Sequence, residues 1–260
     1  MTGPADAPVR ALHPDGSPLD GLSLDAMGCL VRLADPVPAL TAWTVERGVV
    51  APAATIASAL RAEVAFYRRH HLDGRDPVSL RRLRRACAEV FLTAVVDDAD
   101  GAPRRDHGPA EGHGGAGSGG AGPGGAGPFR PRIPPLDDNA VDEFVDALRF
   151  ELLPGVADEL ERLDAAGVPM VCVSNWDCAL PDHLESLGIA RRFRAIVPSA
   201  TAGLDKPDPR IFAVALRALG LPAARVAHLG DEAVDRDGAR AAGMPFLDPP
   251  VAGLAQRLGL

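Results

Sequence analysis

After residue 150, short apolar segments of strand length alternate with segments of helical length, and this alternation limits the possible folds more than any other feature. The clearest strand is the continuous apolar run from 168 to 173, which follows a helix that ends at Gly167. Further helices are expected over 180–187, 209–219 and 235–242, and further strands near 195–197, 226–229 and 245–247. Strands that alternate with helices form parallel sheets, so we predict an α/β fold with a doubly wound parallel sheet.

The part of the chain before this alternation is less regular. Residues 1–20 are rich in Pro, Gly, Asp and Ala and are expected to form a flexible leader. A short strand at Leu22–Leu24 then leads to Asp25. Helical patterns cover 39–70 and 79–96, and in the first of them Ile56, Leu60, Val64 and Tyr67 share one face. The Gly-rich stretch at about 101–135 should be a flexible linker, because it has too few apolar residues to form a core.

Charge and cysteine usage exclude several classes of partner. The formal net charge is −8, which disfavours nucleic acids and anionic membranes, so we expect no partner of either kind. The run Arg81-Arg82-Leu83-Arg84-Arg85 is a local exception, with a solvated helix face favoured over anion binding. The four cysteines have no metal-ligand spacing, and the N-terminus does not resemble a secretion signal. We therefore expect a soluble, cytoplasmic protein.

Polar groups follow four of the expected strands or lie in the adjoining loops. They are Asp25, the pair Ser174 and Asn175, Lys206, and Asp231 with Asp235. Because such loops open at one edge of a parallel sheet, the four groups should converge. Lys206 is the only lysine among 27 basic residues, which favours a site that needs a compact point charge. A carboxylate nucleophile, hydroxyl and amide donors, an ammonium group and a second acidic pair are what covalent phosphoryl transfer with a divalent metal requires.

These segments resemble the four motifs of the haloacid dehalogenase superfamily, and most closely those of its phosphatase-like members. The third and fourth segments read Lys206-Pro207-Asp208-Pro209-Arg210-Ile211-Phe212 and His228-Leu229-Gly230-Asp231-Glu232-Ala233-Val234-Asp235. Val173-Ser174-Asn175-Trp176-Asp177 is similar to the second motif. The resemblance implies a Rossmann-like core at 21–33 and 150–260, with a smaller helical cap domain over 34–149 that carries the Gly-rich linker.

The resemblance also implies roles for individual residues. Asp25 would attack the substrate and form an aspartyl intermediate, while Ser174 and Lys206, with Asn175 beside them, hold the transferred group. Asp231 would bind Mg²⁺ together with Asp25 and the backbone carbonyl of Met27. Asp235 would support the metal shell or orient the hydrolytic water. Ser174 and Asn175 also suit a helix cap, and Asp231 and Asp235 also suit the start of a helix.

Two residues depart from the family pattern. The first motif of the family usually places an aspartate two residues after the nucleophile, as general acid, and a threonine four residues after it. This chain has Met27 and Cys29 at those positions. Met27 cannot donate a proton, and general acid catalysis contributes about 10²–10⁴-fold. The dehalogenases of the superfamily also lack that acid, because a halide leaves without protonation.

Three functions therefore remain open. A Mg²⁺-dependent phosphatase of a small phosphorylated metabolite is favoured by Asp231 and Asp235, and an alkyl phosphate is the expected type of ester. A metal-free 2-haloacid dehalogenase is favoured by Met27, and a catalytically impaired binding protein by Met27 together with Cys29. Tyr67, Arg68, His70 and His71 of the cap are candidates for substrate selection, with a solvated helix end as the alternative. Trp176 is a further candidate for lining the site. The oligomeric state is left open.

Overall fold

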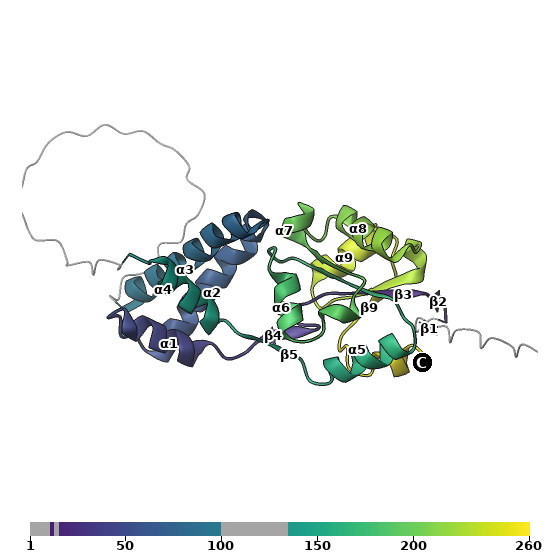
Figure 1. Cartoon of the computed structure of the whole chain (residues 1–260), viewed down its shortest axis with the longest axis horizontal. Helices are drawn as coiled ribbons and strands as arrows, with labels where there is room; N and C mark the ends of the chain where they lie inside the picture. The colour runs from purple at the N-terminus through teal and green to yellow at the C-terminus, as the bar shows by residue number, and fades with distance from the viewer. Residues whose placement is uncertain (1–10, 13–15, 100–134) are drawn as a thin grey trace, which may run out of the picture.

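The computed structural model describes residues 11–12, 16–99 and 135–260, which form a sheet-containing core and a helical cap (Figure 1). The core holds a five-stranded sheet in the order β7-β6-β3-β8-β9, and all of its neighbouring strands are parallel. The strands are β3 (Gly21–Leu24), β6 (Met170–Ser174), β7 (Ala195–Pro198), β8 (Val226–Leu229) and β9 (Phe246–Leu247). The predicted parallel sheet is confirmed.

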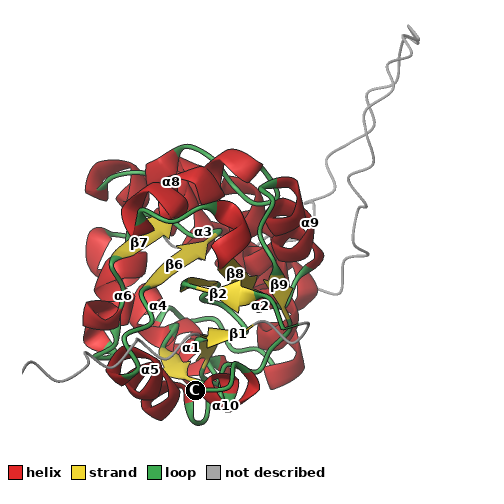
Figure 2. Cartoon of the chain, turned by 90° about the vertical axis from the view of Figure 1, so that its right-hand side faces the viewer, coloured by secondary structure: helices red, strands yellow, loops and turns green. Residues whose placement is uncertain are grey.

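Helices cover both faces of this sheet. Along β6, Met170 and Cys172 pack into one apolar cluster with α5, whereas Val171 and Val173 pack into another with α8. This alternation follows from the two-residue period of a strand. Figure 2 shows α5 and α8 on opposite sides of the strands. The helices of the core are α5 (Val156–Ala165), α6 (Leu180–Ser186), α7 (Ser199–Ala202), α8 (Pro209–Leu219), α9 (Ala233–Ala241) and α10 (Leu254–Arg257). Short 3-10 turns occur at η2 (Ala190–Arg192) and η3 (Ala223–Arg225).

The cap has a hydrophobic core of its own. Its helices are α1 (Val37–Glu46), α2 (Ala53–His70), α3 (Pro77–Ala99) and α4 (Asp138–Ala147), with the 3-10 turn η1 (His71–Asp73) between α2 and α3. Trp43, Phe91 and Phe144 pack together in its centre, and the Trp43 indole donates a hydrogen bond to the Ala140 carbonyl at 2.9 Å. The cap core is separate from the two clusters that enclose the sheet.

The chain passes between core and cap along two short strands. These are β4 (Val31–Leu33) and β5 (Phe150–Leu152), which pair antiparallel and lie between the two parts in Figure 1. The sequence pattern did not predict them, because three residues are too few to show a period. α4 accordingly ends at Ala147, before β5 begins at Phe150.

The structure corrects one further expectation. The predicted flexible leader is wrong near its end: β1 (Ala11–Leu12) pairs with β2 (Pro18–Leu19), and Leu19 is buried against the core. On the predicted apolar face of α2, Ile56 is buried and Val64 is 36% exposed. Nearly all of the predicted Gly-rich linker lies outside the described residues. Within the described residues, each helix is too short or too polar to cross a membrane.

Candidate active site

Asp25 lies where β3 ends, between the ends of the two strands that flank it. Its backbone N–H donates to the Leu229 carbonyl at 2.9 Å, and its side chain is buried. Leu24 is in register with Cys172 of β6 and with Leu229 of β8. The segments that follow β6 and β8 therefore begin beside Asp25, which explains how residues from distant parts of the sequence meet here.

Lys206 is buried next to Asp25, and its ammonium group donates three hydrogen bonds. Nζ donates to Asp25 Oδ1 at 2.6 Å, to the Val173 carbonyl at 3.1 Å and to the Asp235 carboxylate. Burial alone would lower the pKa of Lys206, but the charges of Asp25 and Asp235 raise it above its usual range. Asn175 holds the Lys206 backbone: its Oδ1 accepts from Lys206 N at 2.8 Å and its Nδ2 donates to Lys206 O at 3.0 Å.

Asp235 is held from three sides. Its Oδ1 lies 3.1 Å from His228 Nε2 as well as against Lys206, and its Oδ2 accepts from Glu232 N at 3.0 Å in the capping box of α9. Burial would raise the pKa of Asp235, but hydrogen bonding to His228 and the charge of Lys206 lower it. With its oxygens taken in this way, Asp235 is placed to hold Lys206 rather than to orient water.

His228 is a buried member of the site that the sequence analysis missed. Its Nδ1 lies 2.9 Å from Ser23 Oγ, and burial lowers the pKa of its imidazole. The available signal was a single polar residue in the otherwise apolar strand Val226–Leu229.

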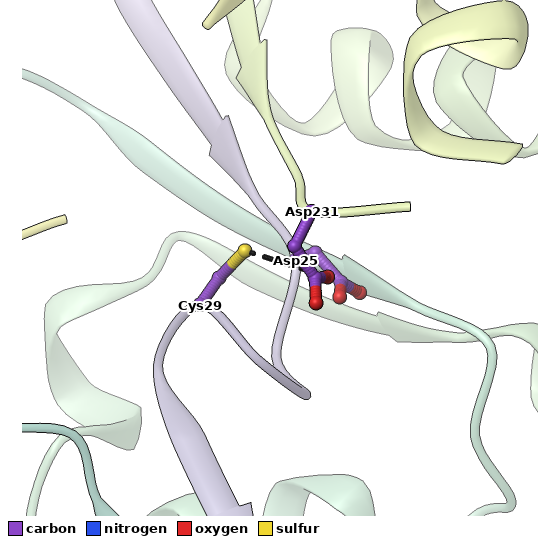
Figure 3. Close-up of side chains that lie close together, drawn as sticks. All are labelled: Asp25, Cys29 and Asp231. Atoms are coloured by element: carbon purple, nitrogen blue, oxygen red, sulfur yellow. Dashed lines mark hydrogen bonds between the residues drawn. The ribbon is translucent and has the colours of Figure 1, made fainter. Parts of the chain in front are cut away.

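Asp25, Cys29 and Asp231 each bring one possible metal-ligand atom within 4.8 Å of the other two. Figure 3 shows the Asp25 and Asp231 carboxylates side by side, with the Cys29 thiol next to them. Gly28 has φ +77°, which favours glycine, and a Cβ there would lie 2.1 Å from Asp231 Oδ2, so glycine leaves room for the Asp231 carboxylate in its present position. Partial burial and the charge of Asp25 raise the pKa of Asp231.

The charge balance of this group fits a bound cation. Lys206 offsets Asp25 and Asp235, whereas Asp231 has no basic partner among the described residues. Burial and the nearby carboxylates raise the pKa of the Cys29 thiol, so the thiol stays protonated and adds no charge. Carboxylate and carbonyl oxygens are the ligands that Mg²⁺ prefers. Asp25, Asp231 and the Met27 carbonyl are therefore residues that could hold it.

A cavity of about 460 Å³ opens over Asp25, between core and cap. Most of the predicted site residues line it: Asp25, Met27, Ser174, Asn175, Lys206 and Asp235 from the core motifs, and Tyr67, Arg68, His71 and Trp176 among the expected specificity residues. His70 does not line the cavity, because its ring stacks on Phe66 and its Nδ1 pairs with Asp73 at 3.2 Å. Asp231 is also outside the cavity lining.

Direct contacts join the cap to the second motif. Tyr67 Oη donates to Asp177 Oδ2 at 2.9 Å and accepts from Asp177 N at 3.2 Å. Cys178 N donates to the Gly74 carbonyl at 2.8 Å. A Cβ on Gly74 would lie 2.8 Å from the Asp177 Cβ, so glycine permits this close approach. Asp177 was part of a recognised motif, but its partner in the cap was not predictable from sequence.

Four other polar residues of the cavity were missed by the sequence analysis: Glu63, Arg84, His183 and Glu232. Glu63 is buried, which raises its pKa to about 6, and the Cys87 thiol hydrogen bonds to it. Its position seven residues after the buried Ile56 was an available signal. In the arginine run, Arg81 and Arg85 pair with Asp138, while Arg84 lines the cavity without an ion pair to any described residue.

Comparisons with known proteins agree with this geometry. A model of the haloacid dehalogenase-like hydrolases matches residues 127–243. The haloacid dehalogenase-like hydrolase domain-containing protein 3 of Homo sapiens is 34% identical over 113 residues, which are 43% of this chain and 45% of that protein. A phosphoglycolate phosphatase of Mesorhizobium japonicum is 36% identical over 95 residues, covering 36% of this chain and 42% of that protein. The matches span less than half the length of either relative.

Solved structures extend the likeness to the whole fold, cap included. A defluorinating L-2-haloacid dehalogenase has a TM-score of 0.60 at 20% identity, with 92% of this chain and 84% of that chain covered. At this identity the likeness concerns the fold and not the reaction. The four motif segments meet at one edge of the sheet, and the family model matches the segments that carry the second, third and fourth. Residues 127–243, which hold three of the four motif segments, therefore resemble the haloacid dehalogenase-like hydrolases, and the fold of the described residues agrees with that likeness.

Proposed function

We propose that this protein is a Mg²⁺-dependent phosphatase that cleaves small phosphate monoesters through an aspartyl phosphate on Asp25. The observation that carries the proposal is the arrangement around this nucleophile. Lys206 contacts Asp25 at 2.6 Å, and Asp231, without a basic partner among the described residues, has a carboxylate oxygen within 4.8 Å of one on Asp25. The relative named phosphoglycolate phosphatase supports a phosphate ester as the substrate.

In the first step, a carboxylate oxygen of Asp25 forms a bond to phosphorus and the bond from phosphorus to the ester oxygen breaks. The ammonium group of Lys206 reduces the repulsion between the carboxylate and the phosphate dianion. Ser174 lines the same cavity, and its hydroxyl would donate a hydrogen bond to a phosphate oxygen. Bound Mg²⁺ would supply further positive charge toward the phosphate oxygens.

The departing alkoxide takes its proton from water, because Met27 has none to donate. In the second step, water attacks the phosphorus of the aspartyl phosphate, the bond to the Asp25 oxygen breaks, and phosphate leaves with Asp25 restored. Asp235 keeps Lys206 against Asp25 throughout. Asn175 contributes by fixing the backbone of Lys206.

A second candidate function is the hydrolysis of 2-haloacids without a metal. Met27 lines the cavity together with Asp25, and a halide leaving group needs no proton. The reaction has no use for Asp231, whose carboxylate beside Asp25 would repel the carboxylate of a haloacid. We therefore place phosphate ester cleavage first.

The test is a turnover screen of phosphate monoesters and 2-haloacids, with Mg²⁺ and with EDTA. We expect phosphate release that requires Mg²⁺, and loss of that release in Asp25→Asn, whose fold is checked by circular dichroism. Trapping of radiolabelled phosphate on the wild-type protein, absent from the variant, would identify the aspartyl intermediate. Halide release in EDTA without phosphate release would replace the proposal with the dehalogenase.

A further inference from the structure

We infer that the substrate of this proposed phosphatase is a phosphate monoester with a largely apolar body that carries a hydroxyl or N–H group bound by His71. The inference rests on the proposed function for the phosphate end of the ligand. It concerns the remainder of the ligand, which the cap and the rim of the core enclose. A small, fully polar ester of two or three carbons does not match this space.

The first observation is the wall of the cavity. Leu60 and Val64 from α2, Leu83 from α3, Phe144 from α4, and Phe150 and Trp176 from the core edge all line it. Its volume of about 460 Å³ lies within the range of about 300–1,000 Å³ that is typical of pockets for drug-sized ligands. Apolar surface gains from being covered, so an apolar chain on the phosphate ester should strengthen binding.

The second observation is the buried ring of His71. Its Nδ1 lies 2.9 Å from the Arg68 carbonyl, which can only accept a hydrogen bond, so Nδ1 carries the proton. In the neutral ring Nε2 then has a free lone pair. This atom is buried and has no hydrogen-bond partner among the described residues, although His71 lines the cavity. A buried acceptor without a donor is destabilising, and a donor on the ligand would satisfy it.

The neighbouring polar groups of the cap have hydrogen-bond partners or contact with solvent. Tyr67 is bonded to Asp177, Glu63 to the Cys87 thiol, and Arg68 to Glu232 at 2.7 Å. The Arg84 guanidinium also lines the cavity, but it is only partly buried and can keep its contact with solvent. His71 is therefore the cap residue whose hydrogen bonding is incomplete.

Non-hydrolysable alkylphosphonates separate this inference from the proposed function, because their binding needs no turnover. Calorimetric titration in Mg²⁺ would measure the affinity of each phosphonate. Ethyl- and heptylphosphonate test chain length. Heptylphosphonate and a series of hydroxyalkylphosphonates, with the hydroxyl at successive positions of a six-carbon chain, test the hydrogen bond. We expect about fourfold tighter binding per added methylene that is buried. At one hydroxyl position we expect a further gain of roughly tenfold over heptylphosphonate.

Two variants assign these gains to the cavity. His71→Phe should abolish the preference for the hydroxyl and keep the preference for length, while the control His70→Phe changes a ring outside the cavity and should keep both. Val64→Asn should weaken the preference for length, and Val78→Asn, at an exposed position away from the cavity, should not.

Equal affinity for ethyl- and heptylphosphonate would overturn the inference, as would a hydroxyl preference that survives in His71→Phe. Parallel assays with the matching phosphate esters keep the two proposals apart. The expected binding pattern without ester hydrolysis would sustain the cavity assignment and end the phosphatase proposal. Faster hydrolysis of two-carbon polar esters than of heptyl phosphate would sustain the phosphatase proposal and end the cavity assignment.

Discussion

Met27 occupies the position from which most relatives of this fold are expected to protonate the leaving group. Its side chain lines the cavity with Asp25, so a carboxyl at this position would face the substrate. The missing proton matters most for alkoxide leaving groups, which are strong bases. It matters little for p-nitrophenolate, which is stable as an anion.

We predict that Met27→Asp raises the turnover of alkyl phosphates by a larger factor than that of p-nitrophenyl phosphate. The upper limit of the difference is about 10²–10⁴-fold, the usual contribution of a general acid. Steady-state rates for both esters give the ratio. Met27→Asn is the control, because its amide has similar size and no acidic proton. An equal change for both esters in Met27→Asp would show that residue 27 does not reach the leaving group.

Glu63 makes the stability of the cap depend on pH. Burial raises its pKa from 4.5 to about 6, so the folded state favours the protonated form. The stabilising contribution is complete below the unfolded pKa and is lost as the pH rises through the folded pKa. At about 1.4 kcal/mol for each pKa unit, the loss is about 2 kcal/mol.

We predict that Glu63→Gln removes this loss. The free energy of unfolding, measured by urea denaturation between about pH 4 and pH 7, should fall less with rising pH in the variant than in the wild type. Glu89→Gln is the control, because Glu89 is exposed on α3. Parallel pH profiles for wild type and Glu63→Gln would mean that Glu63 titrates as an ordinary exposed glutamate.

The residues proposed to react could be singled out from the sequence because each follows a strand or stands in a recognisable motif. Asp25, Ser174, Lys206 and Asp235 all line one cavity, as expected. What the sequence does not contain is the partner of each group. The bond from Tyr67 to Asp177 joins segments that are distant in sequence. The bond from Asp235 to His228 lies within one motif but depends on how α9 packs against β8.

At the scale of elements, the turn after β3 determines how the acidic residues approach each other. Gly28 has a positive φ and leaves room for the Asp231 carboxylate. Asp231 is exposed, so it could move away from an added methyl group without disturbing the fold. The displaced carboxylate would then be less able to bind Mg²⁺ at the proposed metal site.

We predict that Gly28→Ala and Gly48→Ala lose similar stability, roughly 1 kcal/mol for a left-handed alanine, but that only Gly28→Ala weakens Mg²⁺ activation. Gly48 has φ +74° and open space around its Cβ position, so it reproduces the backbone strain without the contact to Asp231. Thermal unfolding measures the stability of each variant. The Mg²⁺ dependence of turnover measures the effect on the proposed metal site. Unchanged Mg²⁺ activation in Gly28→Ala would remove Asp231 from the proposed ligand set.

Elements of the core were predictable where their length allowed a period to show. The strands β6 and β8 and the helices α8 and α9 lie close to their expected ranges. The paired strands β4 and β5 were missed because three residues each give no periodic signal. Val64 was placed on one apolar face with Ile56, Leu60 and Tyr67, and part of that face borders the cavity. A periodic pattern shows that a face is apolar but not what covers it.

Across the whole molecule, the cap contacts the core on two sides of the cavity. One side is the β4 and β5 pair through which the chain passes. The other includes the contacts of Tyr67 with Asp177 and of Gly74 with Cys178, which follow directly after Ser174 and Asn175 of the second motif. Movement of the cap away from the core would have to break this second set, whereas the first can act as a hinge.

We predict that Tyr67→Phe opens this side of the molecule. The variant removes the hydroxyl that both donates to the Asp177 carboxylate and accepts from its backbone N–H, so two buried polar groups lose their partner. Amide hydrogen exchange should then accelerate at Cys178, whose N–H bonds to the Gly74 carbonyl across the interface. If closure of the cap encloses the substrate, KM should also rise.

Arg68→Gln provides the matched control for this last experiment. It breaks the cap-to-core ion pair with Glu232, which is about half exposed on both sides and should therefore contribute little, about 0–1 kcal/mol. Exchange at Cys178 should stay near the wild-type rate in this variant. Equal acceleration in both variants, or none in Tyr67→Phe, would contradict a specific role for Tyr67. An acceleration confined to Tyr67→Phe would show that the buried hydroxyl holds the cap against the second motif.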